Sequence, residues 1–332
     1  MAPSKWLRPY ASRFGMDELT VSVVIPTRDR PGFLAQSLRS VLTQEGVALE
    51  VVVVDDGSKA RLVDEVPAIR DPRVRIVRHD VPRGTCGARN AGVEAARGRW
   101  VAFLDDDDLW APQKLSCQLR ALLESPQCQW ACTGVVVVNG LLRIIGYQRP
   151  PGRQDVAAEM LVRQTVPGGG SGVIAARDLV ERLGGFDARL ALNGDWDMYL
   201  RLAQASPMGS VDAPLLAYRV HRTSASVDVE SVHREFAVME QRYARCREAH
   251  GVTLDRAHWD RWRATAYLRA GRRWRSLQTL RASGRHPGWF GLARDLAASM
   301  VPGSVRIGDY LVGRKVPSAW RADAEGWLDA YR

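Results

Sequence analysis

The chain has 332 residues, of which 46% are hydrophobic and 25% charged, and this composition excludes disordered and collagen-like classes. The length suits one large domain with an appendage, or two modest domains. The net charge is +10, from 47 lysines and arginines against 37 acidic residues. Five cysteines without a C-x-x-C pair argue against a disulfide framework or a zinc knuckle and favour a reducing compartment. Residues 1–19 lack the apolar core of a signal peptide, and no run of about 18 apolar residues occurs, so we expect a cytoplasmic protein without a spanning helix.

Apolar runs and helical stretches alternate along the first third of the chain. Strands are predicted at 21–26, 50–55, 74–77 and 100–104, and helices at 33–42 and 85–97. This alternation predicts βαβ units and a mostly parallel sheet flanked by helices. The nearly continuous valine and isoleucine runs indicate strands that are buried on both faces.

Polar clusters follow three of these strands. They are Thr27–Arg30, Asp55–Ser58 and Asp105–Asp108. In open α/β sheets, ligands bind at the carboxyl ends of the strands. We therefore expect the three loops to converge on one crevice.

The rest of the chain is less regular. A hairpin is predicted over 135–147, a flexible glycine-rich loop over 168–172, a helix over 195–203 and a last strand over 215–220. From residue 229 the pattern is helical and contains six of the eleven tryptophans. These patterns predict an N-terminal extension (1–20), an α/β domain (21–228) and a helical C-terminal region (229–332).

An arginine cluster marks the C-terminal region. Eight arginines and no acidic residue lie between 261 and 285. Such a cluster suits an anionic partner such as phospholipid, lipid diphosphate or nucleic acid, and a solvated helix face explains it equally well. Because no nucleic-acid-binding motif accompanies it, we expect no nucleic acid and keep peripheral membrane contact through 261–285 as an interpretation.

The four consecutive carboxylates at 105–108 carry the clearest chemical signal. They repel one another unless a cation neutralises them. Hard oxygen ligands favour Mg²⁺ or Mn²⁺, which keep coordination positions open for phosphate oxygens. The pattern therefore predicts a metal that holds a diphosphate, and the alternative is an acidic turn that caps the next helix.

Three further positions carry weaker signals. A carboxylate in Asp55–Ser58 could accept a hydrogen bond from a nucleotide, with Thr27 beside it, or it could cap a helix. Asp195 could deprotonate an acceptor hydroxyl as a general base, or it could cap the helix that it begins. His221 follows the last strand and could bind a metal or be structural.

Taken together in their order and spacing, these motifs resemble the family-two inverting glycosyltransferases, which have the GT-A fold. The matching segments are VSVVIPTRDR (21–30), VVVVDDGS (51–58), GARNAGVEAARGRWVAFLDDDDLW (87–110), GGFDARLALNGDWDMYLRLA (184–203) and YRVHRTSAS (218–226). The resemblance covers about two-thirds of the chain.

The resemblance implies a role for each matching position. Residues expected to bind the donor are Thr27, Arg30, Asp56, Asp105, Asp106 and either Arg83 or Arg89. Metal binding is expected at Asp105, Asp107 and His221. Asp195 is expected to act as the general base. The implied cofactor is Mn²⁺ or Mg²⁺. The implied donor is a nucleoside-diphosphate sugar, by default a UDP-sugar, and the implied acceptor is a saccharide or a lipid-linked saccharide.

Two departures from the family pattern affect these expectations. Gly194 stands where an acidic residue often precedes the base, which leaves Asp197 as a fallback base, and Asp29 stands where asparagine is common. The expected function is sugar transfer by direct displacement in cell-surface polysaccharide or glycoconjugate synthesis, in the cytoplasm or at the inner face of the plasma membrane. The alternatives are a catalytically weak nucleotide-sugar-binding protein of the same fold and a nucleotidyltransferase.

Overall fold

The computed structural model of the chain describes residues 20–152, 155–221, 229–269, 271–282 and 316–332. The strands are β1 (Val21–Thr27), β2 (Leu49–Asp55), β3 (Val74–Arg78), β4 (Trp100–Phe103), β5 (Leu109–Trp110), β6 (Trp130–Asn139), β7 (Ile144–Gln148), β8 (Val173–Ala176) and β9 (Met208–Val220). The α-helices are α2 (Pro31–Leu42), α3 (Leu62–Glu65), α4 (Gly84–Ala95), α5 (Lys114–Leu123), α6 (Val156–Val162), α7 (Arg177–Arg182), α8 (Gly194–Ala205), α9 (Val229–Arg242), α10 (Ala244–Ala249), α11 (Arg256–Arg269), α12 (Arg273–Ala282) and α15 (Ser318–Leu328). The 3₁₀ turns are η2 (Pro67–Arg70), η3 (Gly169–Ser171) and η5 (Asp329–Tyr331).

The strands of the described residues form one mixed sheet in the order β3-β2-β1-β4-β8-β6-β9-β5, and β7 pairs with β6. The predicted βαβ part is parallel: β1 pairs with β2 and β4, and β2 pairs with β3. Beyond it, β8 runs antiparallel between β4 and β6, so β6 and its parallel partner β9 point the same way as β1. The carboxyl ends of β1, β2, β4, β6 and β9 therefore meet at one edge, in the α/β, GT-A-type fold that the sequence predicts.

Burial explains why the valine-rich runs form the centre of the sheet. All seven residues of β1 are buried, as are the last five of β2, whereas the edge strand β3 is only partly covered. Gly92 allows α4 to approach β1 closely, because a Cβ at that position would lie 2.2 Å from Cγ1 of Val24. The close approach fixes α4 on the sheet, and with α4 the residues that it presents to the crevice.

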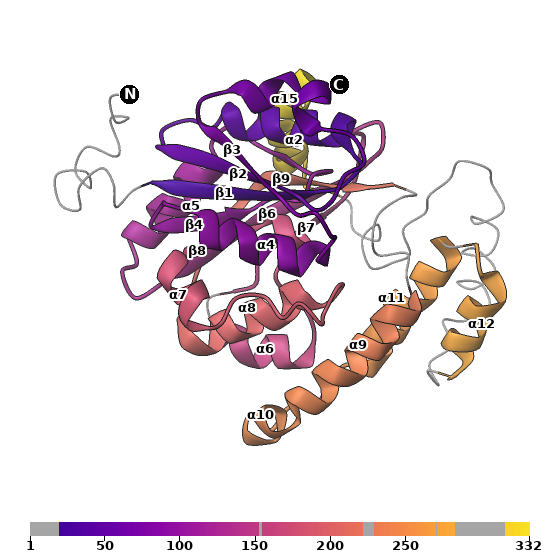
Figure 1. Cartoon of the computed structure of the whole chain (residues 1–332). Helices are drawn as coiled ribbons and strands as arrows, with labels where there is room; N and C mark the ends of the chain where they lie inside the picture. The colour runs from indigo at the N-terminus through magenta and orange to yellow at the C-terminus, as the bar shows by residue number, and fades with distance from the viewer. Residues whose placement is uncertain (1–19, 153–154, 222–228, 270, 283–315) are drawn as a thin grey trace.

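Helices cover both faces of the sheet (Figure 1). Helices α2 and α15 lie on one face, and α4 lies on the other with α6 and α8 beyond it. Helix α15 shares a core with the sheet: Trp320, Ala324 and Leu328 are buried against Leu109 and Val136. The division of the chain into the regions 1–20, 21–228 and 229–332 stays a prediction. The structure shows that α15, which belongs to the third region, packs on β6 and β9 of the second.

Helices α9 to α12, which precede α15 in the C-terminal region, lie on the side of α6 and α8, away from the sheet (Figure 1). Trp259 of α11 stacks on Trp196 of α8, with ring centroids 5.0 Å apart, and Trp327 of α15 donates to the carbonyl of Pro214. Trp274 of α12, by contrast, is 64% exposed. Of the predicted arginine cluster 261–285, residues 270 and 283–285 lie outside the described residues. In the described part of the chain we find no helix with the length and hydropathy needed to cross a membrane.

Candidate active site

The sheet edge brings the predicted polar loops together because its strands end in register. Thr27 at the end of β1 pairs with Asp55 at the end of β2, and Val24 pairs with Phe103 at the end of β4. The loop of carboxylates that follows β4 therefore lies beside Thr27. Each of the four carboxylates in this loop has a different set of partners.

Asp106 faces the end of β1. Its Oδ2 accepts a hydrogen bond of 2.7 Å from the hydroxyl of Thr27, and its Oδ1 lies 3.4 Å from Nη1 of Arg30. Burial, and then the charge of Asp107, raise the pKa of Asp106 to about 7, while Thr27 and Arg30 oppose the rise. The predicted donor-binding residues Thr27, Arg30 and Asp106 thus form one contact group.

Asp107 faces the end of β9. Its Oδ2 lies 2.8 Å from Nε2 of His221 and 3.2 Å from Nη1 of Arg30. Phe33 of α2 stacks on the His221 ring at a centroid distance of 4.7 Å and so restricts its orientation. A carboxylate oxygen and an imidazole nitrogen in this arrangement suit Mn²⁺ or a similar divalent ion.

Asp105 faces α4 instead. Its Oδ1 accepts from Nη2 of Arg89 at 2.5 Å, and this guanidinium is buried. Burial is the largest single influence on the pKa of Arg89 and lowers it, but the combined effect of Asp105, Cys86, Tyr199 and Asp195 raises this pKa. Among the described residues, no group of three or more His, Cys, Asp and Glu side chains is placed to hold a metal by itself. A metal at this edge would therefore depend on Asp107 and His221 together with oxygens of the donor, and Asp105 as a ligand stays a prediction.

Asp108 has a structural position that the sequence does not reveal. It is fully buried; its Oδ2 accepts from the hydroxyl of Ser171 at 2.5 Å, and its Oδ1 accepts from the backbone N–H of Arg219 at 2.8 Å. Burial, and then the charges of Asp107 and Asp105, raise its pKa well above the usual range. Asp108 therefore ties η3 and β9 to the loop of carboxylates.

Asp56 is buried at the end of β2, where it organises the entrance to α4. Its two oxygens accept from the backbone N–H groups of Arg83 and Gly84 at 2.8 and 2.9 Å, and Oδ1 lies 2.8 Å from Nδ1 of His79. Arg83 has an exposed side chain, whereas Arg89 reaches the carboxylates. Of the two arginines that the sequence could not separate, the structure therefore puts Arg89 inside the site and Arg83 at its rim.

Asp195 lies in the first turn of α8 next to the glycine loop. Its Oδ1 accepts from the backbone N–H of Trp196 at 2.7 Å, and a Cβ on Gly169 would lie 3.5 Å from its Oδ2. Burial raises the pKa of Asp195 to about 6; Arg89 lowers it and Asp105 raises it further. A carboxylate that titrates near neutral pH is suited to accept a proton.

The glycine loop joins Asp195 to the carboxylates after β4. A Cβ on Gly170 would lie 1.7 Å from Nη2 of Arg89 and 3.0 Å from Oδ1 of Asp105, while the neighbouring Gly169 lies beside Asp195. Gly169 also has a φ of 50°, which disfavours larger residues. The loop expected to be flexible is thus a buried turn whose glycines make room for Arg89. It places residues 105 and 195 on adjacent parts of one site.

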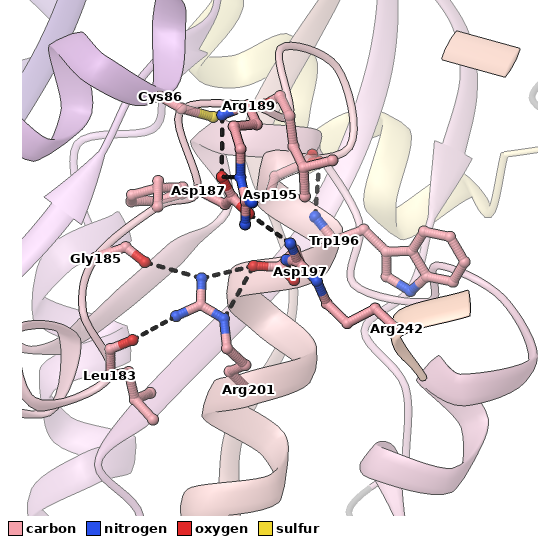
Figure 2. A network of polar contacts seen from close by, with 12 residues as sticks. Cys86, Leu183, Gly185, Asp187, Arg189, Asp195, Trp196, Asp197, Arg201 and Arg242 are labelled. Carbon is pink, nitrogen blue, oxygen red and sulfur yellow. Dashed lines mark hydrogen bonds and ion pairs between the residues drawn. The ribbon is translucent and has the colours of Figure 1, made fainter. Parts of the chain in front are cut away.

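The fallback base, Asp197, does not fit that role. Its side chain is completely buried, and its oxygens accept from Arg201, Arg242 and the hydroxyl of Tyr243 at 2.6 to 2.9 Å. Figure 2 shows Arg201 bridging Asp197 to the carbonyls of Leu183 and Gly185. Asp197 therefore stabilises α8 and its surroundings, and Asp195 remains the candidate base.

Both departures from the family pattern have local physical reasons. A Cβ on Gly194 would lie 2.2 Å from Sγ of Cys86, so this position has no room for an acidic side chain. Asp29 has a φ of 53°, a conformation that aspartate and asparagine both tolerate, and its Oδ1 accepts from the backbone N–H of Lys59. Neither departure removes a group that contacts Asp195.

Comparison with known proteins shows what this chain resembles. Residues 22–177 match the model of glycosyl transferase family 2. Over 95 residues the chain is 48% identical to the succinoglycan biosynthesis protein ExoO of Rhizobium meliloti (strain 1021), a match that covers 29% of this chain and 27% of that protein. The chain resembles the family 2 glycosyltransferases.

Two other comparisons agree with this family 2 resemblance. The chain is 34% identical over 110 residues to the UDP-Glc:alpha-D-GlcNAc-diphosphoundecaprenol beta-1,3-glucosyltransferase WfgD of Escherichia coli, which covers 33% of this chain and 44% of that protein. The solved mannosyltransferase PcManGT from Pyrobaculum calidifontis, in complex with GDP-Man and Mn²⁺, has a TM-score of 0.52 at 20% identity and covers 85% of this chain and 81% of that chain. The structural likeness shows the GT-A-type fold. The chain spans less than half the length of ExoO and WfgD, and the family 2 match ends before Asp195 and His221.

Proposed function

We propose that this chain is an inverting, metal-assisted glycosyltransferase that moves a sugar from a nucleoside diphosphate to an acceptor hydroxyl in cell-surface polysaccharide synthesis. One observation carries the proposal: within a family 2 fold, the glycine loop puts the partly buried Asp195 beside Arg89 and Asp105, at the sheet edge that also bears Asp107 and His221. The similarity to the succinoglycan biosynthesis protein ExoO supports polysaccharide synthesis, and the similarity to WfgD, a UDP-Glc glucosyltransferase, supports a sugar nucleotide as donor.

The donor's nucleotide would lie along the ends of β1 and β2. Thr27 and Asp56 are the residues that the resemblance assigns to the base, and both are buried at this edge. Arg30 lies between two carboxylates, where its charge would also attract the diphosphate. UDP is the default nucleotide, and the GDP-Man complex of PcManGT makes GDP the first alternative to test.

A divalent ion would be held by Asp107 and His221, with the diphosphate and water as its other ligands. When bound, it would neutralise the charge that builds up on the leaving diphosphate. Asp195 would take the proton of the acceptor hydroxyl as that hydroxyl attacks the anomeric carbon from the side opposite the diphosphate. Arg89, which is held by Asp105, places a positive charge near both Asp105 and Asp195. This charge lowers the pKa of Asp195 and so favours its ionised form.

The acceptor side is suggested by an arginine-lined cavity of about 760 Å³. Arg143, Arg219, Arg321 and Arg332 line it, against a single carboxylate, Glu325. The guanidinium of Arg219 lies 5.2 Å from the centre of the Phe33 ring, which in turn stacks on His221, so one aromatic ring links the cavity to the metal ligands. We propose that the acceptor carries an anionic group, such as the diphosphate of a lipid-linked saccharide, and binds here.

Membrane contact remains a proposal that rests on α12. Trp274 is largely exposed between the exposed residues Arg273 and Arg275, a combination typical of a helix at an anionic membrane surface. Such contact would bring the chain to a lipid-linked acceptor at the inner face of the plasma membrane.

The test is a transfer assay on the full chain with Mn²⁺, a panel of UDP-, GDP- and dTDP-sugars and saccharide acceptors with and without a lipid diphosphate. We expect release of nucleoside diphosphate that requires one donor and one acceptor. Release of pyrophosphate would instead identify a nucleotidyltransferase. If the chain binds a donor but neither transfers its sugar nor slowly hydrolyses it anywhere in the panel, the chain is a binding protein and the proposal is refuted.

A further inference from the structure

A carboxylate of the C-terminal region binds the backbone directly before the candidate base. Glu235 of α9 is 7% exposed, and its Oε1 accepts from the N–H of Ala191 at 2.8 Å. Its Oε2 accepts from the N–H groups of Leu192 and Asn193, both at 2.9 Å. One side chain thus satisfies three consecutive backbone donors, the last of them only two residues before Asp195.

These hydrogen bonds hold the segment that leads into α8, which has no side-chain cap of its own. Asn193 is the N-cap residue of α8, but its side chain forms no capping hydrogen bond with the helix. Carboxylates that accept from free backbone N–H groups form strong, charge-assisted bonds. Glu235 therefore determines the direction in which the chain enters α8, and hence where the first-turn residue Asp195 points.

The same helix holds α8 a second time, just beyond the base. Arg242 at the end of α9 contacts Asp197 at 2.6 Å and Asp187 at 2.5 Å (Figure 2), and the hydroxyl of the next residue, Tyr243, donates to Asp197 at 2.7 Å. Asp195 therefore lies between two contacts from one helix. On the opposite side the segment is held by Cys86, whose Sγ donates to the carbonyl of Leu190.

We propose that Glu235 is a positioning residue for Asp195, so that helix α9 of the C-terminal region is part of the catalytic apparatus. The inference rests on the proposed role of Asp195 as the base. The physical reason is that Asp195 can accept the proton only if its carboxylate lies within hydrogen-bond reach of the acceptor hydroxyl. A displacement of about 1 Å can lower the rate about 100-fold.

The pKa of Asp195 provides a measurement that would not change if Glu235 had a purely structural role. The titratable groups that act on it are Arg89 and Cys86 of α4, Asp105 after β4 and Tyr199 of α8. Burial is the largest cause of its raised pKa of about 6. If the backbone before α8 loosens, water reaches Asp195 and its pKa falls, so the acid limb of the kcat profile moves to lower pH.

The experiment compares the full wild-type chain with Glu235→Gln and with a matched control, Glu240→Gln. Glu240 lies on the same helix, is only partly buried and pairs with Arg256, so the control removes an equal charge without touching residues 191–193. For Glu235→Gln we expect kcat to fall about 10- to 100-fold, donor KM to stay within about twofold, and the acid limb to move to lower pH. The control should match wild type in all three.

Hydrogen exchange of the 191–193 amides gives a second readout that needs no turnover. Exchange should be faster in Glu235→Gln and unchanged in the control, because only the first variant replaces one of the two oxygens that accept from these amides by an NH2 group and removes the negative charge. Glu235→Asp, which keeps the charge but shortens the reach, should fall between wild type and Glu235→Gln and serves if the glutamine variant does not fold. Unchanged exchange, or a loss of kcat with an unmoved acid limb, would overturn the inference. Inactivity of the wild type would instead overturn the proposed function, and this inference with it.

Discussion

Replacement of Asp195 by asparagine tests the proposed chemistry most directly. The amide oxygen can still accept from the N–H of Trp196 at about the present 2.7 Å, and the side-chain volume hardly changes, so the variant should fold. What it loses is the ability to accept a proton. General base assistance contributes about 10²- to 10⁴-fold, which corresponds to about 3 to 5 kcal/mol of the barrier.

The raised pKa of Asp195 also predicts how this step depends on pH. With a pKa of about 6, Asp195 is mostly ionised at pH 7, and only the ionised form accepts a proton. Below pH 6 the wild-type kcat should therefore fall about tenfold for each pH unit, whereas Asp195→Asn should lack this limb. Donor binding should be spared, because the donor-binding residues Thr27 and Asp56 do not depend on Asp195 for their contacts.

The assay is release of nucleoside diphosphate at saturating donor and acceptor between pH 4.5 and 8.5, with donor affinity measured separately by thermal shift. Asp212→Asn is the matched control, since Asp212 lies on β9, is exposed and pairs with the exposed Arg149. Turnover of Asp195→Asn within about threefold of the control would refute the assignment. A retained acid limb in that variant would show that another group titrates.

Four further predictions concern the metal site, the arginine-lined cavity, the buried Asp197 and the exposed Trp274. Asp107→Asn should lower turnover at least about tenfold and raise the Mn²⁺ concentration needed for half-maximal rate, and full activity of the wild type in excess chelator would count against a metal here. Arg143→Gln should raise KM for an acceptor that carries a diphosphate and leave KM for the same sugar without phosphate unchanged; equal effects on both acceptors would contradict the anionic cavity. Asp197→Asn should destabilise the fold by about 3–5 kcal/mol in denaturant unfolding, because two arginines lose a buried partner, and a change below about 1 kcal/mol would argue against this role. Trp274→Ala should reduce co-sedimentation with anionic vesicles, and absence of lipid-dependent pelleting of the wild type would dispose of membrane contact.

Much of the fold could be predicted because its signals are local. The valine-rich runs, their spacing and the helices between them are sufficient to predict that β1, β2 and β4 are parallel strands of one sheet, and the structure adds that β1 lies between the other two. Once the strands are parallel, their ends must share an edge, so the convergence of Thr27, Asp56 and Asp105–Asp108 also follows from sequence. The helix predicted over 195–203, which begins at Gly194 in the structure, and the strand that ends before His221 follow from local patterns in the same way.

The distribution of partners within the site could not be predicted. The sequence presents four equivalent carboxylates at 105–108, and only packing assigns Asp105 to Arg89, Asp106 to Thr27, Asp107 to His221 and Asp108 to Ser171. Three of these partners lie 63 to 114 residues away in the chain. Spacing along a sequence fixes which face or edge a residue occupies, but it carries no information on which distant side chain will meet it there.

The same reason explains what the sequence left open in the C-terminal region. Arginine and tryptophan content alone fitted a membrane-bound helix or a packed one, because composition does not say which face of a helix is covered. Glu235, Arg242 and Trp320 resemble ordinary helix residues until the tertiary structure places them against the loop before α8, against Asp197 and against the core of the sheet. Residue patterns thus determined the sheet and the edge where chemistry is expected, and long-range packing decided which groups face one another at that edge.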